Sequence, residues 1–330
     1  MNKRCLHISC WGALITLFLL SSCKMDMTEL CDDHTHTTNM QVTFDWQLSP
    51  EATAKGMAVY FYNMEKPAND PIRYDFAGME GGTLKLTPGT WQAITFNNDT
   101  ETILLRGTES IHTMEAYTRQ SSIEEGTMLT RSSGERWPTT RAETLAVILE
   151  PDQLWCAVSE PFTLGIDEKP RTISFKPESR ISEISITIRN VPNLQYTSQF
   201  GGSITDLAPS IFLASGRQGA GRVTQAFTID VIDSNTLRMH FHTFGLVPQI
   251  EGTGEQPTNQ LTIYAILADG TEWSYTEDVT GQLYNQEEQT ENLSINIELE
   301  DLPVPKPIVN GSGFQPTIDD WQGTEIDVSN

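Results

Sequence analysis

The chain has 330 residues and a formal net charge of −23 at pH 7. This charge excludes a protein whose own surface docks on nucleic acid or on anionic lipid, because both are negatively charged. Charged residues make up 20% of the sequence and hydrophobic residues 38%, so the chain has enough apolar side chains to build cores and is not disordered throughout. Its length suits two ordinary domains.

The first 22 residues have the three parts of a secretory signal peptide. Lys3 and Arg4 supply the positive start, and an apolar stretch from Trp11 to Leu20 follows, shorter than the ~20 residues that span a bilayer. Leu20-Ser21-Ser22-Cys23 then fits the lipobox of bacterial lipoproteins. We predict that the signal is removed and that Cys23 is lipidated and anchors the chain to a membrane. The alternative is an ordinary cleaved signal beside a coincidental cysteine.

Hydrophobic and polar residues alternate through most of the chain beyond Met40. The alternating segments are 42–46, 57–62, 84–86, 91–96, 145–149, 184–188, 227–231, 237–241, 263–267 and 293–297. A period of two is typical of half-buried antiparallel strands. Turn signals such as Pro88-Gly89, Gly201-Gly202 and Asp269-Gly270 separate these segments. We predict an all-β fold of two tandem Greek-key β-sandwich domains.

Changes in composition divide the chain into five parts. We expect a signal peptide at 1–22, a lipidated tether at 23–38, sandwiches at 39–166 and 167–302, and a connector with a tail at 303–330. Within the first domain, residues 119–141 show little periodicity and predict a long exposed loop. The connector is rich in proline and then in glycine.

Two cysteines remain once Cys5 and Cys10 leave with the signal and Cys23 is lipidated. Cys31 and Cys156 are able to form a disulfide in an oxidising compartment, but two cysteines do not make a disulfide framework. Cys156 lies in an apolar run. The sequence favours a small buried side chain at this position.

Two groups of residues resemble metal ligands. The first is Asp32-Asp33-His34-Thr35-His36, which combines carboxylates and imidazoles. A metal-dependent hydrolase would use this cluster. A structural zinc site needs about four rigidly held ligands, whereas this group lies in the tether, so a solvated linker is favoured. His240 and His242 share one face of a predicted strand without an apparent third ligand. We predict neither metal nor cofactor.

The sequence has no catalytic motif. Nucleophile elbows, zinc-protease motifs and phosphate-binding loops are all missing, and we predict no enzyme. The glycine-rich run 216–221 joins two predicted strands and is expected to be a hairpin loop instead of a phosphate cradle. Arg131, Arg136 and Arg141 lie in the long loop. They are either exposed charges or a site for an arginine-specific protease.

Several motifs resemble known families. In the first domain these are Leu30-Cys31-Asp32-Asp33-His34-Thr35-His36, Val42-Thr43-Phe44-Asp45-Trp46, Gly56-Met57-Ala58-Val59-Tyr60-Phe61-Tyr62, Arg73-Tyr74-Asp75-Phe76, Pro88-Gly89-Thr90-Trp91, Phe96-Asn97-Asn98-Asp99-Thr100-Glu101 and Arg106-Gly107. With these strings the first domain resembles a Bacteroidales lipoprotein family catalogued only as a domain of unknown function.

The second domain looks like the C-terminal half of fimbrillin-type proteins. Asp269-Gly270-Thr271, Asp278-Val279-Thr280, the strand 293–299 and the tail residues Gly311-Ser312-Gly313-Phe314 with Asp319-Asp320-Trp321 carry this likeness. The resemblance implies two transthyretin-like sandwiches in a surface-exposed protein, anchored to the outer membrane as a fimbrial shaft, tip or anchor subunit. It supplies no catalytic residues.

Two functions remain open at this point. The first is a fimbrillin-like subunit or anchor that assembles by β-strand addition to homologous subunits, with the tail 314–328 as the donated or self-capping strand. The second is a monomeric surface module for a glycan or a protein. Exposed aromatic side chains would mark the second, and Tyr60, Tyr62, Trp137 and Trp273 are the candidates.

Overall fold

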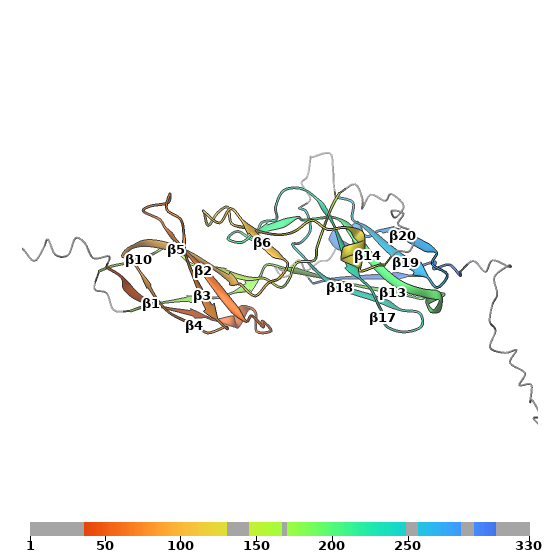
Figure 1. The fold of residues 1–330 in the computed structure, drawn as a ribbon, viewed down its shortest axis with the longest axis horizontal. Coiled ribbons are helices and arrows are strands. Elements are labelled where there is room, and N and C mark those ends of the chain that lie inside the picture. The colour runs from red at the N-terminus through yellow and green to blue at the C-terminus, as the bar shows by residue number, and fades with distance from the viewer. Residues whose placement is uncertain (1–35, 131–144, 167–169, 249–256, 285–293, 308–330) are drawn as a thin grey trace, which may run out of the picture.

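The computed structural model describes residues 36–130, 145–166, 170–248, 257–284 and 294–307. These residues form an elongated molecule with two β-sandwiches arranged one after the other along its long axis (Figure 1). The helical elements are short: α2 (Ile123–Thr127), α4 (Thr280–Tyr284) and two 3-10 turns, η1 (Trp46–Leu48) and η2 (Leu194–Tyr196). None of the helices among the described residues is long and apolar enough to cross a membrane.

The first sandwich consists of two facing sheets. One sheet has the order β11 (Arg171–Phe175), β1 (Thr38–Phe44), β4 (Gly81–Leu86). The other has the order β12 (Glu178–Ser179), β9 (Trp155–Val158), β5 (Gly89–Asn97), β2 (Gly56–Asn63), β3 (Ile72–Ala77), and β10 (Phe162–Leu164) also pairs with β5. β1 pairs in parallel with β11 and antiparallel with β4. Alternate residues of β1 and β2, including Val42 and Val59, fill the core between the sheets.

The second sandwich also has two facing sheets. One has the order β20 (Glu272–Asp278), β19 (Gln260–Leu267), β14 (Thr197–Leu207), β16 (Val223–Thr228), β8 (Ala146–Ile148). The other has the order β17 (Asp230–Val231), β18 (Leu237–Thr243), β13 (Ser182–Arg189), β21 (Ser294–Glu300). Phe227 of β16 stacks on Phe241 of β18 with the ring centroids 4.2 Å apart, which shows that the two sheets share one core.

A third, three-stranded sheet joins the two sandwiches. It has the order β15 (Ser210–Phe212), β7 (Glu115–Thr118), β6 (Ile103–Arg106). Residues 107–114, between β6 and β7, form a connecting segment. Tyr62, on the outer face of β2, donates a hydrogen bond to the Thr108 carbonyl in this segment (2.8 Å). Ala58, Met114 and Ile211 belong to the same buried cluster as the core of the second sandwich. One continuous apolar core therefore runs across the junction, and this holds the two sandwiches as neighbours.

The all-β fold built on sandwiches is confirmed, but the strands divide differently from the predicted boundary at 166/167. β11 and β12 follow that boundary, yet they pair with β1 and β9 of the first sandwich. Residues 171–179 have the local pattern of a strand in either sandwich. The assignment of β11 depends on pairing with β1, ~130 residues earlier in the chain, which a local pattern does not reveal.

Residues 119–130 also differ from the predicted exposed loop of the first domain. Ile123, Thr127 and Leu129 are buried, and α2 packs on β14 and β16 of the second sandwich. Ser122 caps α2 by accepting a hydrogen bond from the Glu125 amide (3.2 Å). The remainder of the predicted loop lies outside the described residues.

Candidate functional site: sheet edges and chain ends

The open edges of the sheets are the surfaces on which a protein of this kind is able to bind another strand. An edge strand presents unpaired backbone N–H and C=O groups that template the addition of a strand. Among the described residues, the two large sheets of the second sandwich end at β20 and β8 and at β17 and β21, and the largest sheet of the first sandwich ends at β3. These edges are not equally suited to that role.

The β3 edge carries charged side chains. Arg73 and Asp75 form an ion pair (2.8 Å), and Asn98 donates a second hydrogen bond to the Asp75 carboxylate (2.8 Å). The hydrogen bond from Arg73 holds the pKa of Asp75 below its usual value. Arg73 also lies over the Tyr60 ring, 5.6 Å from its centroid. Charged groups on an edge strand oppose pairing with another chain, so β3 is a poor acceptor.

The β21 edge lies beside an apolar cleft. β21 and β20 end the two facing sheets, and the cleft between them reaches the interior of the second sandwich. Its apolar lining comprises Ile188, Leu261, Ile263, Tyr275, Leu299 and Leu302. On the open side of β21, the Glu298 backbone N–H donates to the side chain of Gln282 in α4 (3.2 Å). This N–H points away from β13, and it is therefore a group that an added strand would use.

The chain leaves the second sandwich directly after β21. Leu302 and Val304 are buried, and Asn193 donates a hydrogen bond to the Val304 carbonyl (2.7 Å). These contacts fix the beginning of the predicted connector. The predicted tail 314–328 lies outside the described residues.

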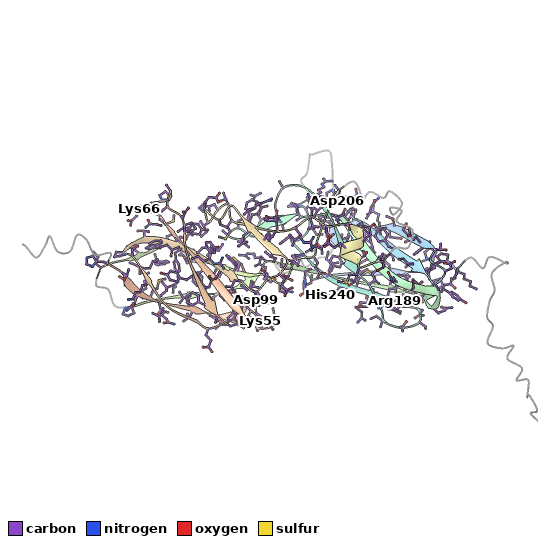
Figure 2. All side chains as sticks on the ribbon, viewed as in Figure 1. Lys55, Lys66, Asp99, Arg189, Asp206 and His240 are labelled. Carbon is purple, nitrogen blue, oxygen red and sulfur yellow. The ribbon has the colours of Figure 1, made fainter. Side chains whose placement is uncertain are left out.

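The described chain enters and leaves the molecule at opposite poles. Figure 1 shows β1 in the sandwich at one end of the long axis, whereas β21 runs toward the other end. Figure 2 shows Arg189, which pairs with Glu298 of β21, toward the same end as the exit of the chain. A chain with its ends so placed is suited to link one object at its N-terminal pole to another at its C-terminal pole.

Several predicted site residues lie outside the described part of the chain. These are Cys23, Cys31, Asp32, Asp33, His34, Arg131, Arg136, Trp137 and Arg141. His36, at the start of the described chain, is exposed. Cys156 is a free, fully buried thiol, as the apolar run predicted.

The aromatic candidates for ligand stacking are covered or only partly exposed. Tyr62 is buried beneath the connecting segment, and Tyr60 stacks on Phe96. Trp273 is half-buried on β20 and stacks on Tyr275, with the ring centroids 6.2 Å apart. Among the described residues, the exposed large hydrophobic side chains include no aromatic one.

The glycine-rich run 216–221 lies between β15 and β16, so it joins two strands, as predicted. The two strands do not pair with each other, since β15 belongs to the joining sheet and β16 to the second sandwich. The loop nevertheless turns back on β15 as the predicted hairpin: Gln218 forms an antiparallel bridge with Ile211, and the Phe212 amide donates to the Arg217 carbonyl (2.9 Å). The Gly219 amide donates to the Ser210 carbonyl (2.8 Å), which fixes the loop against β15.

His240 and His242 have a third neighbour that local sequence reasoning missed. β18 pairs with β13 so that Glu183 lies opposite His242, and ligand atoms of all three residues lie within 4.8 Å of one another. Figure 2 shows His240 near the middle of the long axis. Glu183 is 57 residues away in sequence from His240, and only the strand register could have indicated it.

The chain is similar in sequence and in structure to known proteins. In sequence, the chain is 24% identical over 281 residues to a Bacteroides ovatus protein named as a candidate fimbrium anchoring subunit, Fim4B, an alignment that covers 81% of this chain and 77% of that protein. In structure, it is similar to a candidate adhesin from Bacteroides ovatus, with a TM-score of 0.59, 22% identity and coverage of 82% and 93% of the two chains. The fimbrial anchor protein Mfa2 from Porphyromonas gingivalis matches with a TM-score of 0.49, 13% identity and coverage of 80% and 90%.

The fold is that of a two-sandwich β protein, as in the Bacteroides ovatus structure. The family described as domain of unknown function DUF5119 matches residues 22–228, more than half of the sequence. The chain belongs to this family, as the motifs of the first domain indicated.

Proposed function

We propose that the chain is a lipid-anchored fimbrial subunit that fixes a partner subunit to the outer membrane at the cell surface. The observation that carries this proposal is the placement of the chain ends at opposite poles of the molecule. Lipid on Cys23 would hold the first sandwich at the membrane and would turn the β21 edge of the second sandwich away from it. The name of the Bacteroides ovatus relative supports an anchoring role.

The partner subunit would bind through β-strand addition at the β21 edge. An incoming strand gains backbone hydrogen bonds along β21. Residues 314–328, which follow the buried Leu302 and Val304, would either be donated to the partner or cover this same edge. Gln282, which accepts from the Glu298 amide, is the group that an added strand has to displace.

Membrane attachment is tested with Cys23→Ala. The wild-type chain should incorporate labelled palmitate and sediment with the outer membrane, and the variant should be released into the soluble fraction. Two or three acyl chains hold a protein almost permanently, since each buried CH₂ contributes roughly 0.8 kcal/mol. Firm attachment of the variant would remove the lipid from the proposal.

Partner binding is tested with Glu298→Pro. Proline removes the N–H that faces the open edge and is tolerated in edge strands, so the variant should fold but lose co-purification with its partner. Glu298→Ala is the matched control, since it removes the exposed pair with Arg189 and keeps the N–H. Such exposed pairs contribute little to stability. Equal recovery of the partner with both variants would argue against the β21 edge.

The role of the tail is tested by deleting residues 314–330. The expected result is loss of co-purification with the partner subunit if the tail is the donated strand, and stronger co-purification if the tail covers the β21 edge. A tail of equal length made of glycine and serine serves as the control for chain length. Unchanged assembly after the deletion would remove the tail from the mechanism and leave the β21 edge as a pure acceptor.

A further inference from the structure

Two adjacent strands of the second sandwich place four polar side chains on one outer face. On β18, Met239 and Phe241 point into the core, so His240 and His242 between and after them point outward. Glu183 and Ser185 of β13 lie directly opposite His242 and His240. The two imidazole rings meet edge to face, with their centroids 5.6 Å apart. This face is thus a compact group of two imidazoles and one carboxylate.

The His242 ring is held in one orientation by Glu150. The Glu150 carboxylate accepts a hydrogen bond from the His242 backbone N–H (2.8 Å) and lies 3.1 Å from the ring nitrogen Nδ1. A carboxylate at Nδ1 favours a proton on that nitrogen, and this leaves the Nε2 lone pair available. The side chain of Gln225 donates to the His242 carbonyl, so the backbone of His242 is fixed at both of its polar groups.

The Nε2 lone pair of His242 converges with the Glu183 carboxylate. The two groups are 3.7 Å apart. Gln153 donates its side-chain NH₂ to both of them, at 2.8 Å from His242 Nε2 and 3.1 Å from Glu183 Oε1. A positively polarised group therefore lies where the two lone pairs meet. The Ser185 hydroxyl lies 3.0 Å from His240 Nδ1, which leaves Nε2 of His240 for another partner.

We propose that His240, His242 and Glu183 bind a divalent transition-metal ion, zinc above all. Two neutral imidazoles and one carboxylate are ligands that zinc accepts, with bond lengths of about 2.0–2.2 Å and a fourth position left to solvent. Binding would draw the ligand atoms together from within 4.8 Å through rotation of the exposed His240 and withdrawal of the Gln153 amide. Glu150 acts as a positioning residue that orients the His242 ring, in the manner of carboxylates behind zinc-bound histidines.

The site would also tie the junction of the two sandwiches together. Glu150, which keeps its contact with His242, lies between β8 of the second sandwich and β9 of the first, whereas the three ligands lie on β13 and β18 of the second. An ion bound to the oriented His242 would stabilise the folded chain in proportion to its affinity, because it binds only the folded arrangement. This inference is independent of the fimbrial proposal, since it uses side chains of β13 and β18 and none of the backbone groups on the open side of β21.

The test measures zinc binding to the mature chain in a Cys23→Ser, His34→Ala, His36→Ala background, which removes the lipid site and the histidines of the tether. Calorimetry with zinc chloride at pH 8 should give one zinc per chain, and cobalt(II) should give the visible absorption of a low-coordinate site. His240→Ala and Glu183→Ala should each weaken binding at least tenfold. His112→Ala, which removes an exposed histidine of the connecting segment, should leave it unchanged.

Glu150→Gln tests the positioning role separately. It should weaken zinc binding by about 10–100-fold at an unchanged stoichiometry of one, while the melting temperature in EDTA stays close to that of the parent. Absence of zinc binding in the parent would overturn the proposal. So would binding that is equally tight in His240→Ala, a variant that changes only an exposed side chain and is expected to fold.

Discussion

Gly201 lies directly against Thr127: a Cβ on Gly201 would come within 2.4 Å of the Thr127 Cβ and 3.2 Å of Leu129. A Cβ on the next residue, Gly202, would likewise come within 2.4 Å of the Phe227 ring. Both glycines lie inside β14, the middle strand of its sheet. Gly201 lets α2 and Leu129 pack on the strand at a distance that a side chain would forbid, and Gly202 leaves the same room for the Phe227 ring.

Gly201→Ala is therefore expected to destabilise the fold. The added methyl group overpacks the contact with α2, and overpacking costs about 1–3 kcal/mol. Urea unfolding of the variant measures the loss in the free energy of unfolding. Adding Thr127→Gly to the same chain should recover part of this loss, because it removes the opposing Cβ. A double-variant cycle without coupling would show that the contact between these two residues is not the cause.

The Glu115 carboxylate should make stability depend on pH. It accepts two hydrogen bonds from Arg106 (2.7 and 2.8 Å) and one from Ser210, and the bonds from Arg106 lower the pKa of Glu115. A lowered pKa in the folded state contributes stability above the unfolded pKa of about 4.3, and this stability is lost as pH falls through the folded value. Glu115→Gln should cost about 1–2 kcal/mol at pH 7, because Arg106 is partly exposed.

The difference between wild type and Glu115→Gln should shrink as the pH is lowered below 4. Urea midpoints between pH 3 and pH 7 measure it. Glu51→Gln, a change at an exposed carboxylate, is the matched control and should leave the pH profile as it is. If the difference in stability between the two proteins stays constant from pH 3 to pH 7, ionisation of Glu115 does not contribute to the stability.

Arg222 and Asp206 form a pair whose acidic member is fully buried. Arg222 donates to the Asp206 carboxylate at 3.1 Å, and the Asp206 side chain has no exposed surface. Removing one partner of a buried ion pair costs about 3–5 kcal/mol, because the buried charge loses the opposite charge beside it. Arg222→Met should destabilise the protein by an amount in this range, as measured by urea unfolding.

Asp206→Asn in the Arg222→Met background should recover part of that loss. Asparagine removes the charge and tolerates the positive φ of 59° at this position. Recovery would show that the buried charge causes the loss. If the double variant is less stable than Arg222→Met, the carboxylate has a stabilising role that does not depend on the arginine.

The thiol of Cys156 should be unreactive in the folded protein. Burial raises its pKa to about 12, so the reactive thiolate is scarce at neutral pH. In a Cys23→Ser, Cys31→Ser chain, Ellman's reagent at pH 8 should label Cys156 only at the rate of unfolding, and within the mixing time in urea. Rapid labelling of the native chain would show that this part of the core opens readily.

Sequence reasoning recovered most strands that carry a local alternating pattern. The segments 57–62 and 184–188 lie in β2 and β13, and residues 42–44 of the segment 42–46 lie in β1, whereas Trp46 begins η1. Burial of every second side chain in a strand leaves its mark in a few consecutive residues. β14 escaped because Gly201-Gly202 is also a turn signal. The meaning of that pair depends on Thr127 and Phe227, which are distant in the sequence.

The features that escaped sequence reasoning depend on contacts between distant segments. The assignment of β11 to the first sandwich depends on its pairing with β1, and the third member of the histidine group depends on the register of β13 with β18. The burial of α2 depends on the surface of β14 and β16. A single sequence carries no record of these pairings, since each partner alone has an ordinary local pattern.

The first strand, β1, and the last strand, β21, each pair in parallel with another strand, β11 and β13 respectively. This arrangement has a mechanical consequence for an anchored chain. Tension between the poles enters at the N-terminal end of β1, passes from β11 into β13 and leaves at the C-terminal end of β21. β1 shares five aligned positions with β11, and β13 shares seven with β21. In a parallel pair, opposite forces at these ends slide the strands lengthwise, so the hydrogen bonds resist as a group instead of unzipping singly. Stretching single molecules from residues 36 and 307 should therefore require more force than peeling β3 from β2, its antiparallel neighbour.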